Sequence, residues 1–301
     1  MHATGAVDTW KAADGKSPLR GRRRQVGAWL QLAPASLYFL VFFIAPITVL
    51  IGLSFYSVRN FDFVPELTLG NYWEVITSST LRAFFARTLR IAAIISVIVV
   101  LVSYPFAYII SYVMPRRRQI LYFLVLVSLF GGYLVRIYAW RNILGRAGVL
   151  NQSLIGMGIV DEPVRFFLNS PFAIVITSVN FLIPLGVLPI FASMQNISPR
   201  LIEAARDLGS SQIHAALKVV LPLSMRGVSA AFAFSFIAAA AEWVTPAMVG
   251  GTGDQMVGNQ IAFQFGGGLN WPLGAALAIS LVIVVVVILS LLLAGVRWIS
   301  R

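Results

Sequence analysis

One acidic side chain stands within an apolar run of this sequence. Glu242 lies in the segment GVSAAFAFSFIAAAAEWVTPAMVG, whose other residues are mostly small or apolar. A carboxylate in such a run normally faces protein or a water-filled path. Glu242 could therefore accompany a cation along that path, with the adjacent Trp243 ring offering a cation–π face. The alternative is a structural carboxylate near the outer membrane boundary, paired with an arginine or a backbone donor.

Four further residues could line a route for a cationic solute. Tyr133, Tyr138 and Trp140 cluster at the end of one apolar run, and Asn180 lies within the next. Tyrosine and tryptophan are also common anchors at the membrane–water interface. Interfacial anchoring is therefore the alternative role for the three aromatic residues.

Other site chemistry is missing from the sequence. The chain has no cysteine, and His2 and His214 are too far apart in sequence to suggest a metal site. The segment GGTGDQ has glycines but lacks the lysine of a phosphate-binding loop. The sequence thus predicts neither a metal site nor a catalytic set nor a nucleotide site.

The composition indicates an integral membrane protein. Hydrophobic residues make up 58% of the 301 residues, charged residues 11%, and the mean hydropathy is +0.84. A membrane-spanning helix needs roughly 20 apolar residues, and long continuous runs of this kind argue against a barrel. We therefore predict an all-α membrane protein with six transmembrane helices. They are expected at about residues 29–53, 84–113, 120–143, 171–195, 227–249 and 272–296.

The basic residues predict the orientation. With a cytoplasmic N-terminus, most of the 23 lysines and arginines fall on the cytoplasmic side, as the positive-inside rule requires. Arg82, Arg87 and Arg90 oppose this trend, whereas the loop after the fifth span has neither lysine nor arginine. The net charge of +12 is thus read as topology rather than nucleic-acid binding. We expect an N-in, C-in protein with a flexible tail (1–28) and one transmembrane domain (29–301).

An amphipathic segment separates the fourth and fifth spans. In NISPRLIEAARDLGSSQIHAALKVVLPLSMRG, Ser198 and Pro199 are typical of a helix start, and Gly209 of a helix end. A second helix should follow and end at Pro222, with an apolar face formed by Ile213, Ala216, Leu217 and Val220. Two short helices meeting at a glycine form a knob that suits a groove on another protein.

The spacing within this segment resembles a known family. Glu203-Ala204-Ala205, then Gly209, then Leu221-Pro222 resembles the EAA loop of permease subunits of bacterial ABC importers, with Val219 where isoleucine is commoner. Three further segments are similar to the spermidine/putrescine class, specifically the first of its two permease subunits. They are LVRIYAWRNILGRAGVLNQ (134–152), AEWVTPAMVGG (241–251) and NWPLGAA (270–276).

The resemblance implies a type I ABC importer permease fold in the bacterial inner membrane and a transport role without enzymatic activity. Loop 198–223 would form the coupling helices that dock on two ATP-binding subunits, which would bind ATP and Mg²⁺, so that this chain needs no cofactor. The other implied partners are a homologous second permease, an extracytoplasmic solute-binding protein and lipid, but no nucleic acid. The implied coupling residues are Glu203, Ala204, Ala205, Asp207, Gly209, His214, Leu221 and Pro222. The solute would be a small organic cation, spermidine or putrescine.

Two alternatives stay open. Importers of opines, phosphonates or amino-acid-like solutes share much of these motifs. In a different class, an ion-coupled secondary transporter would use Glu242 as its ion site. Such carriers often contain inverted repeats with paired broken helices, and no internal repeat is evident in this sequence.

Overall fold

The computed structural model describes residues 33–59, 62–64 and 66–299. The predicted tail (1–28) lies outside these residues. The chain divides into two compact units, Met1–Leu53 and Ser54–Arg301, each considered by itself. The described part of the first unit is a helix of 21 residues, Ala33–Leu53, about 31 Å long and sufficient to cross a bilayer core.

This first helix contains a wide turn just before a proline. The π turn η1 (Leu40–Ile44) precedes α2 (Ala45–Leu53), in which Pro46 is the second residue. In a regular α-helix a proline ring collides with the carbonyl four residues earlier. A π turn at that point changes the local backbone spacing, so the helix continues through the proline.

The second unit begins with a small hairpin and a short helix. Strands β1 (Ser57–Arg59) and β2 (Asp62–Val64) pair antiparallel, with Val58 opposite Phe63. Helix α3 (Gly70–Thr77) follows. Its Asn71 amide donates hydrogen bonds to the Ser54 and Tyr56 carbonyls at 2.8 and 2.7 Å, which fixes α3 to the start of this unit.

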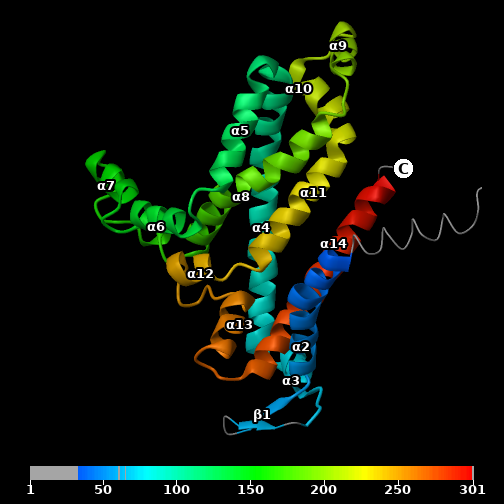
Figure 1. Ribbon diagram of the computed structural model, residues 1–301. Helices are drawn as coiled ribbons and strands as arrows, with labels where there is room; N and C mark the ends of the chain where they lie inside the picture. Colours follow the sequence, from blue (N-terminus) through cyan, green and yellow to red (C-terminus); the bar gives the residue numbers. More distant parts are fainter. Residues whose placement is uncertain (1–32, 60–61, 65, 300–301) are drawn as a thin grey trace, which may run out of the picture. The chain divides into compact units, whose positions relative to one another are not determined.

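Three long helices form the centre of the second unit. They are α4 (Ser79–Tyr108), α8 (Pro171–Met194) and α11 (Leu221–Ala240), and each packs against the other two (Figure 1). Helix α14 (Trp271–Ile299) packs against α13 (Val257–Phe265) and α3. The helices predicted as spans two, four and six are therefore present. The shorter elements are η2 (Ile109–Val113), η3 (Pro115–Arg117), η4 (Arg165–Phe167), α9 (Pro199–Asp207), α10 (Gln212–Ala215) and η5 (Ala216–Val220).

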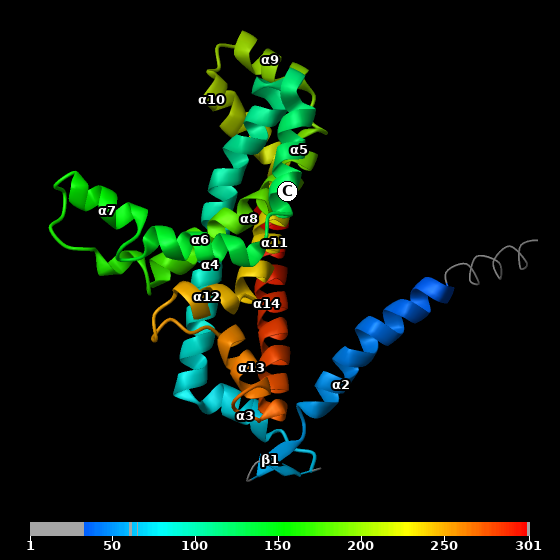
Figure 2. The ribbon, with the colours of Figure 1, turned by 60° about the vertical axis from the view of Figure 1, so that its left-hand side comes forward.

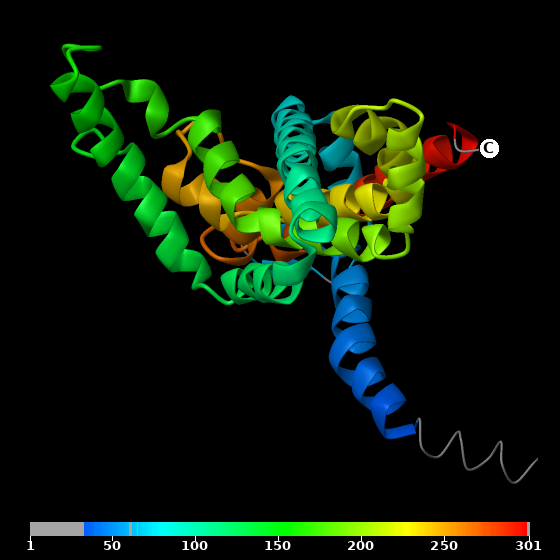
Figure 3. The same cartoon turned by 90° about the horizontal axis from the view of Figure 1, so that it is seen from above.

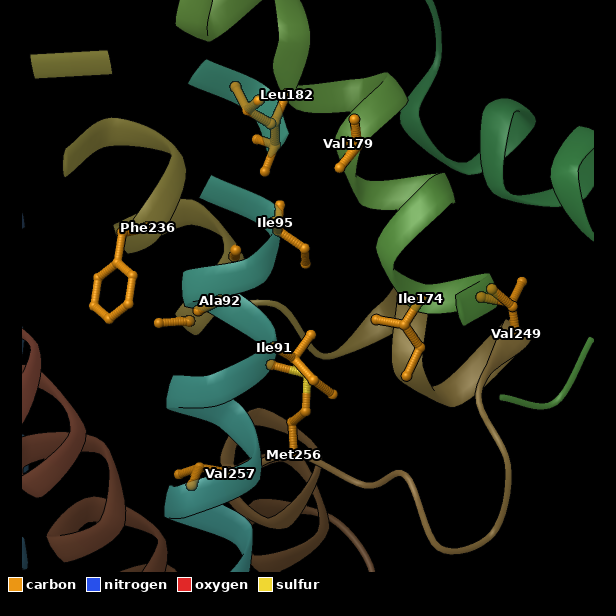
Figure 4. Packing of buried hydrophobic residues seen from close by; sticks show 14 of the residues in the cluster. Ile91, Ala92, Ile95, Ile174, Val179, Leu182, Phe236, Val249, Met256 and Val257 are labelled. Atoms are coloured by element: carbon orange, nitrogen blue, oxygen red, sulfur yellow. The ribbon is translucent and has the colours of Figure 1, made fainter. Parts of the chain in front are cut away.

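The core of this unit is an apolar contact between α4, α8 and α11. Figure 4 shows Ile91 and Ile95 of α4 between Ile174 of α8 and Phe236 of α11, and all four side chains are buried. Small residues on α11, Gly227 and Ala231 among them, are buried and allow the helices to approach closely. Helix α8 stays continuous through Pro184 and Pro189.

The predicted third span is not one straight helix. In place of 120–143, the structure has α5 (Arg118–Leu129) and α6 (Tyr133–Leu144), and the helical segments before and after the break differ in direction by 86°. The break falls at Gly131-Gly132, where two residues of low helix propensity follow one another. Helix α6 and the next helix, α7 (Val149–Gly156), therefore project sideways from the three central helices (Figure 3).

The predicted fifth span was wrong at both ends. It was placed at 227–249, but one continuous helix runs from Gln212 to Ala240 through α10, η5 and α11. Pro222 does not end the preceding helix, because the π turn η5 lies directly before it, as η1 does before Pro46. After Ala240 the chain breaks and then forms the short helix α12 (Val244–Val249).

The described residues thus contain five helices that are long and apolar enough to span a membrane. The count rises to six if the bent α5–α6 pair is one span. Apart from the β1–β2 hairpin, the described structure is helical. The all-α fold is confirmed at this level.

A buried threonine on α4 holds the loop before α13. The Thr88 hydroxyl donates to the Phe84 carbonyl at 2.8 Å and accepts from the Val257 amide at 2.9 Å, and Thr88 is fully buried. Replacement of Thr88 by valine keeps the shape but leaves the Val257 N–H unpaired. We expect the free energy of unfolding to fall by about 1–3 kcal/mol. Thermal unfolding of the purified protein in detergent tests this expectation.

The matched control is Thr77→Val. The Thr77 hydroxyl also bonds the carbonyl four residues earlier, at 2.7 Å, but Thr77 is exposed. Removal of the Thr77 hydroxyl should change the unfolding midpoint little, since water can replace its hydrogen bond. Equal shifts for the two variants would contradict a specific role for Thr88.

Candidate functional site

The first helix of the 198–223 pair ends in a regular glycine motif. Gly209 has a φ of +86°, a conformation that favours glycine. The Gly209 amide donates to the Arg206 carbonyl at 2.9 Å and the Ser210 amide to the Ala205 carbonyl at 3.0 Å. These two bonds form a Schellman motif, which satisfies the last carbonyls of α9. The predicted stop at Gly209 is confirmed.

The helix starts are partly as predicted. Pro199 is the first residue of α9, after Ser198 at the N-cap. The Ser198 side chain makes no capping hydrogen bond, however, so the predicted side-chain cap was wrong. The next helix is capped instead by Ser211, whose hydroxyl accepts from the His214 amide at 3.2 Å.

Most of the predicted coupling residues face outward. Ile202 is buried and Ala205 half-buried against the bundle, whereas Leu208 is 89% exposed. The predicted residues with exposed side chains or backbone are Glu203, Ala204, Asp207, Gly209, His214 and Pro222, while Leu221 is half-buried. Residues 203, 206, 207 and 209–211 surround an open hollow of about 460 Å³. The pair therefore presents a polar, hollowed surface with an apolar residue beside it.

The apolar face predicted for the second helix is divided between two environments. Val220 is buried and Ala216 half-buried, but Ile213 and Leu217 are 74% and 54% exposed. Packing against the bundle uses Val220 together with Ala215, which the predicted face did not include. The exposed pair lies beside an apolar hollow shared with Tyr104 and Tyr108 of α4.

Glu242 lies in the break between α11 and α12 rather than inside a helix. Its Oε1 accepts hydrogen bonds from the Val244 amide at 2.9 Å and the Thr245 amide at 3.1 Å. The same oxygen accepts a hydrogen bond from the Tyr133 hydroxyl. Tyr133 is the first residue of α6, directly after the other break. One carboxylate therefore joins the two interrupted helices.

The other residues predicted for the solute route do not gather around this carboxylate. Trp243 is the N-cap of α12 and is 49% exposed, and Tyr138 on α6 is 53% exposed. Trp140 packs against the apolar core, and Asn180 is exposed on α8. The structure thus brings together two of the six predicted residues, Glu242 and Tyr133.

Four neighbours of Glu242 were missed or given another role in the sequence. Thr177, Ser178 and Phe181 of α8 and Arg136 of α6 line one small pocket with Glu242 and Tyr133. The sequence did contain a pattern that could have grouped three of them. Thr177 and Ser178 precede Phe181 by four and three residues, so all three side chains lie on one face of a helix. From the sequence alone, Arg136 suits pairing with acidic groups on another subunit or a nearby loop. In the structure its guanidinium carbon lies 5.9 Å from the Phe181 ring centre.

One helix connects the two candidate sites. The continuous helix from Gln212 to Ala240 has 29 residues, so it is about 43 Å long. It starts in the 198–223 pair and ends two residues before Glu242. Figures 1 and 2 show α9 and α10 at the opposite end of this unit from α3 and α13. A displacement of the helix pair would therefore reach the Glu242 region through one rigid element.

These features define a class of protein, a membrane-embedded permease with interrupted helices around polar side chains and an exposed helix pair. More specifically, the chain belongs to the family described as binding-protein-dependent transport system inner membrane component, whose model matches residues 90–301. The family description also gives its location, the inner membrane.

Known proteins extend this assignment. The chain is 32% identical over 252 residues to the spermidine/putrescine transport system permease protein PotB of Haemophilus influenzae, covering 83% of this chain and 87% of the relative. A stretch of 124 residues is 28% identical to PotC of Escherichia coli, a permease protein of the same kind of system, covering 41% of this chain and 47% of that protein. A bacterial alginate ABC transporter, solved with an alginate pentasaccharide-bound periplasmic protein, has a TM-score of 0.72 at 16% identity, covering 94% of this chain and 98% of its own.

The comparisons confirm the resemblance inferred from the EAA loop. At 16% identity the alginate transporter shows a shared fold only. The sequence relatives are transport permeases, which supports the importer interpretation over the ion-coupled secondary transporter.

Proposed function

We propose that this chain forms half of the translocation pathway of a type I ABC importer for a small organic cation, spermidine or putrescine. The observation that carries the proposal is the continuous helix between the exposed 198–223 pair and the Glu242 region. Motion at one end of such a helix changes the packing at the other end. This geometry suits alternating access driven by a separate motor.

The motor in this proposal is a pair of ATP-binding subunits, which bind ATP and Mg²⁺ and dock on the 198–223 pair. Leu208, with 89% of its surface exposed, would enter an apolar groove on that partner. Glu203 and Asp207 would contact basic groups at the rim of the groove. Gly209 adds no side chain that would hold the two surfaces apart.

The proposed topology is N-in, C-in with six spans, the bent α5–α6 pair being the third. The basic turn Arg116–Arg118 supports it, because the Arg118 guanidinium donates to Gln195 Oε1 at 2.6 Å, directly after α8 and close in sequence to the 198–223 pair. Basic residues and the helix pair therefore share one end of the bundle. The positive-inside rule assigns that end to the cytoplasm.

Two further partners belong to the proposal. A second, homologous permease subunit would complete the pathway, as the partial similarity to PotC suggests. An extracytoplasmic binding protein would deliver the solute, as the family description and the alginate transporter complex suggest. The polyamine assignment draws on the spermidine/putrescine relatives and on the carboxylate at position 242.

The proposal predicts ATP-dependent polyamine uptake. Proteoliposomes that contain this chain, its second permease and its ATPases should accumulate radiolabelled putrescine or spermidine only when the binding protein and ATP are present. The binding protein should also bind these amines in a calorimetric titration. A binding protein that ignores both amines and takes a neutral sugar or an anion would contradict the solute assignment.

A further inference from the structure

A small polar pocket lies beside Glu242, where α6, α8, α11 and α12 meet. Its volume is about 10 Å³, close to the least that holds one water molecule. The polar and aromatic side chains in its wall are those of Tyr133, Arg136, Thr177, Ser178, Phe181, Glu242 and Thr245, and the Thr245 hydroxyl lies 3.2 Å from that of Tyr133. A group of one heavy atom fits this space, and a larger rigid group does not.

Two hydroxyl groups in the pocket wall have no partner in the described structure. Thr177 and Ser178 are 2% and 4% exposed, and neither hydroxyl oxygen has a hydrogen bond there. Ser96 and Ser235, buried in the same bundle, donate to the carbonyl four residues earlier. Buried polar groups are normally paired. The two free hydroxyls therefore indicate a ligand that supplies hydrogen bonds within the pocket.

The charge of Glu242 specifies the kind of ligand. Its Oε1 already accepts three hydrogen bonds, whereas none of the hydrogen bonds recorded among the described residues uses Oε2. A free carboxylate oxygen and two hydroxyl oxygens together accept hydrogen bonds from a small cationic donor. The Tyr133 and Phe181 rings, 5.0 Å apart and inclined by 62°, add aromatic surface that attracts a cation.

Arg136 sets a limit on how tightly a cation is held. Its guanidinium shares the pocket wall and lies against Phe181. This positive charge balances Glu242 when the pocket is empty and repels a cation that enters. A transport pathway needs such weak binding, because the solute must leave as well as enter.

We infer that this pocket binds one primary ammonium group of the solute during its passage, with Glu242 as counter-ion and Thr177 and Ser178 as hydrogen-bond acceptors. The inference rests on the proposed function and deepens it. It assigns the solute class as linear amines with an unsubstituted terminal –NH₃⁺. A trimethylated ammonium group is too large for the pocket and offers no N–H to the hydroxyls.

The test removes the charge and keeps the local structure. In Glu242→Gln the amide oxygen can still accept from Tyr133 and the two backbone amides, but the negative charge is gone. Thr177→Val removes one acceptor at nearly constant volume. In the reconstituted importer we expect KM for putrescine-loaded binding protein to rise at least tenfold in Glu242→Gln and severalfold in Thr177→Val.

Glu162→Gln is the matched control, because Glu162 is an exposed carboxylate in the loop after α7. The KM of the Glu162→Gln importer should equal that of the wild type. The thermal unfolding midpoint of each variant separates a local effect from misfolding. If the wild type transports putrescine and Glu242→Gln keeps its KM, the pocket holds only water and the inference is overturned while the proposed function stands. If the wild-type importer moves neither putrescine nor spermidine, the proposed function itself fails.

Discussion

The replacement of Gly209 by aspartate should reduce ATP-driven uptake more than tenfold while the protein remains inserted in the membrane. Within the described part of the chain, a Cβ at Gly209 would meet no atom beyond its own sequence neighbours within 4 Å, so the substitution causes no clash there. The φ of +86° adds a local cost of about 1–2 kcal/mol, and aspartate is among the residues that tolerate this region. The main effect is therefore expected at the proposed ATPase interface, where a charged side chain would stand between the two surfaces.

The measurement is uptake and ATP hydrolysis by the reconstituted importer, with Glu203→Lys as a second variant. Uptake should fall in both variants, and hydrolysis should no longer rise when the loaded binding protein is added. Gly158→Asp is a close control, because Gly158 has a φ of +70°, is also free of neighbours within 4 Å and lies just after α7. Normal uptake with Gly209→Asp would contradict the docking role. Equal losses at Gly158 and Gly209 would assign the effect to backbone strain.

Hydrophobic runs predicted where helices occur better than where they break. The fourth and sixth spans were predicted within about a residue of α8 and of the apolar part of α14. The third and fifth were predicted as single helices, because an apolar run has the same composition whether its backbone is straight or bent. The glycine pair 131–132 was visible in the sequence, but only tertiary packing decides whether such a pair bends a helix by 86°.

Proline led to the opposite error, a helix end predicted where the helix continues. Pro222 was predicted to end a helix, since a proline ring normally blocks the turn before it. A π turn over Ala216–Val220 removes that conflict. The sequence rule describes a regular α-helix and does not predict a wide turn. The same turn explains why the second helix of the 198–223 pair continues into α11, as one helix from Gln212 to Ala240.

The candidate sites differed in how much the sequence revealed. The helix pair was predictable because Gly209, Pro199 and the charged residues act on their own local backbone. The surroundings of Glu242 were not, since Tyr133, which bonds it, and Thr177, which shares its pocket, lie 109 and 65 positions away in the chain. Such contacts depend on how α6, α8 and α12 pack. A single sequence gives only the type of each residue and not its distant neighbours.

Gly227→Leu should destabilise the bundle most strongly of the substitutions considered. Gly227 is buried on α11 where this helix crosses α8. A Cβ there would lie 2.5 Å from the Pro189 carbonyl oxygen, 2.5 Å from the Ser193 Cβ and 3.1 Å from the Ile190 Cα. Two of these atoms belong to the backbone of a long helix, so they cannot move aside as a side-chain tip can. Helices that meet through glycine lose this close approach when a larger residue is introduced.

We expect Gly227→Leu to lower the free energy of unfolding by about 3 kcal/mol or more, and Gly227→Ala to have a smaller effect of the same sign. Thermal unfolding in detergent and the yield of membrane-inserted protein measure both changes. Gly295→Leu is the control, because a Cβ at Gly295 on the long helix α14 meets nothing within 4 Å. Since α11 links the 198–223 pair to Glu242, forcing it away from α8 should also impair uptake in any Gly227→Ala protein that still folds. An unfolding midpoint unchanged by Gly227→Leu would mean that α8 and α11 are not in contact at this crossing.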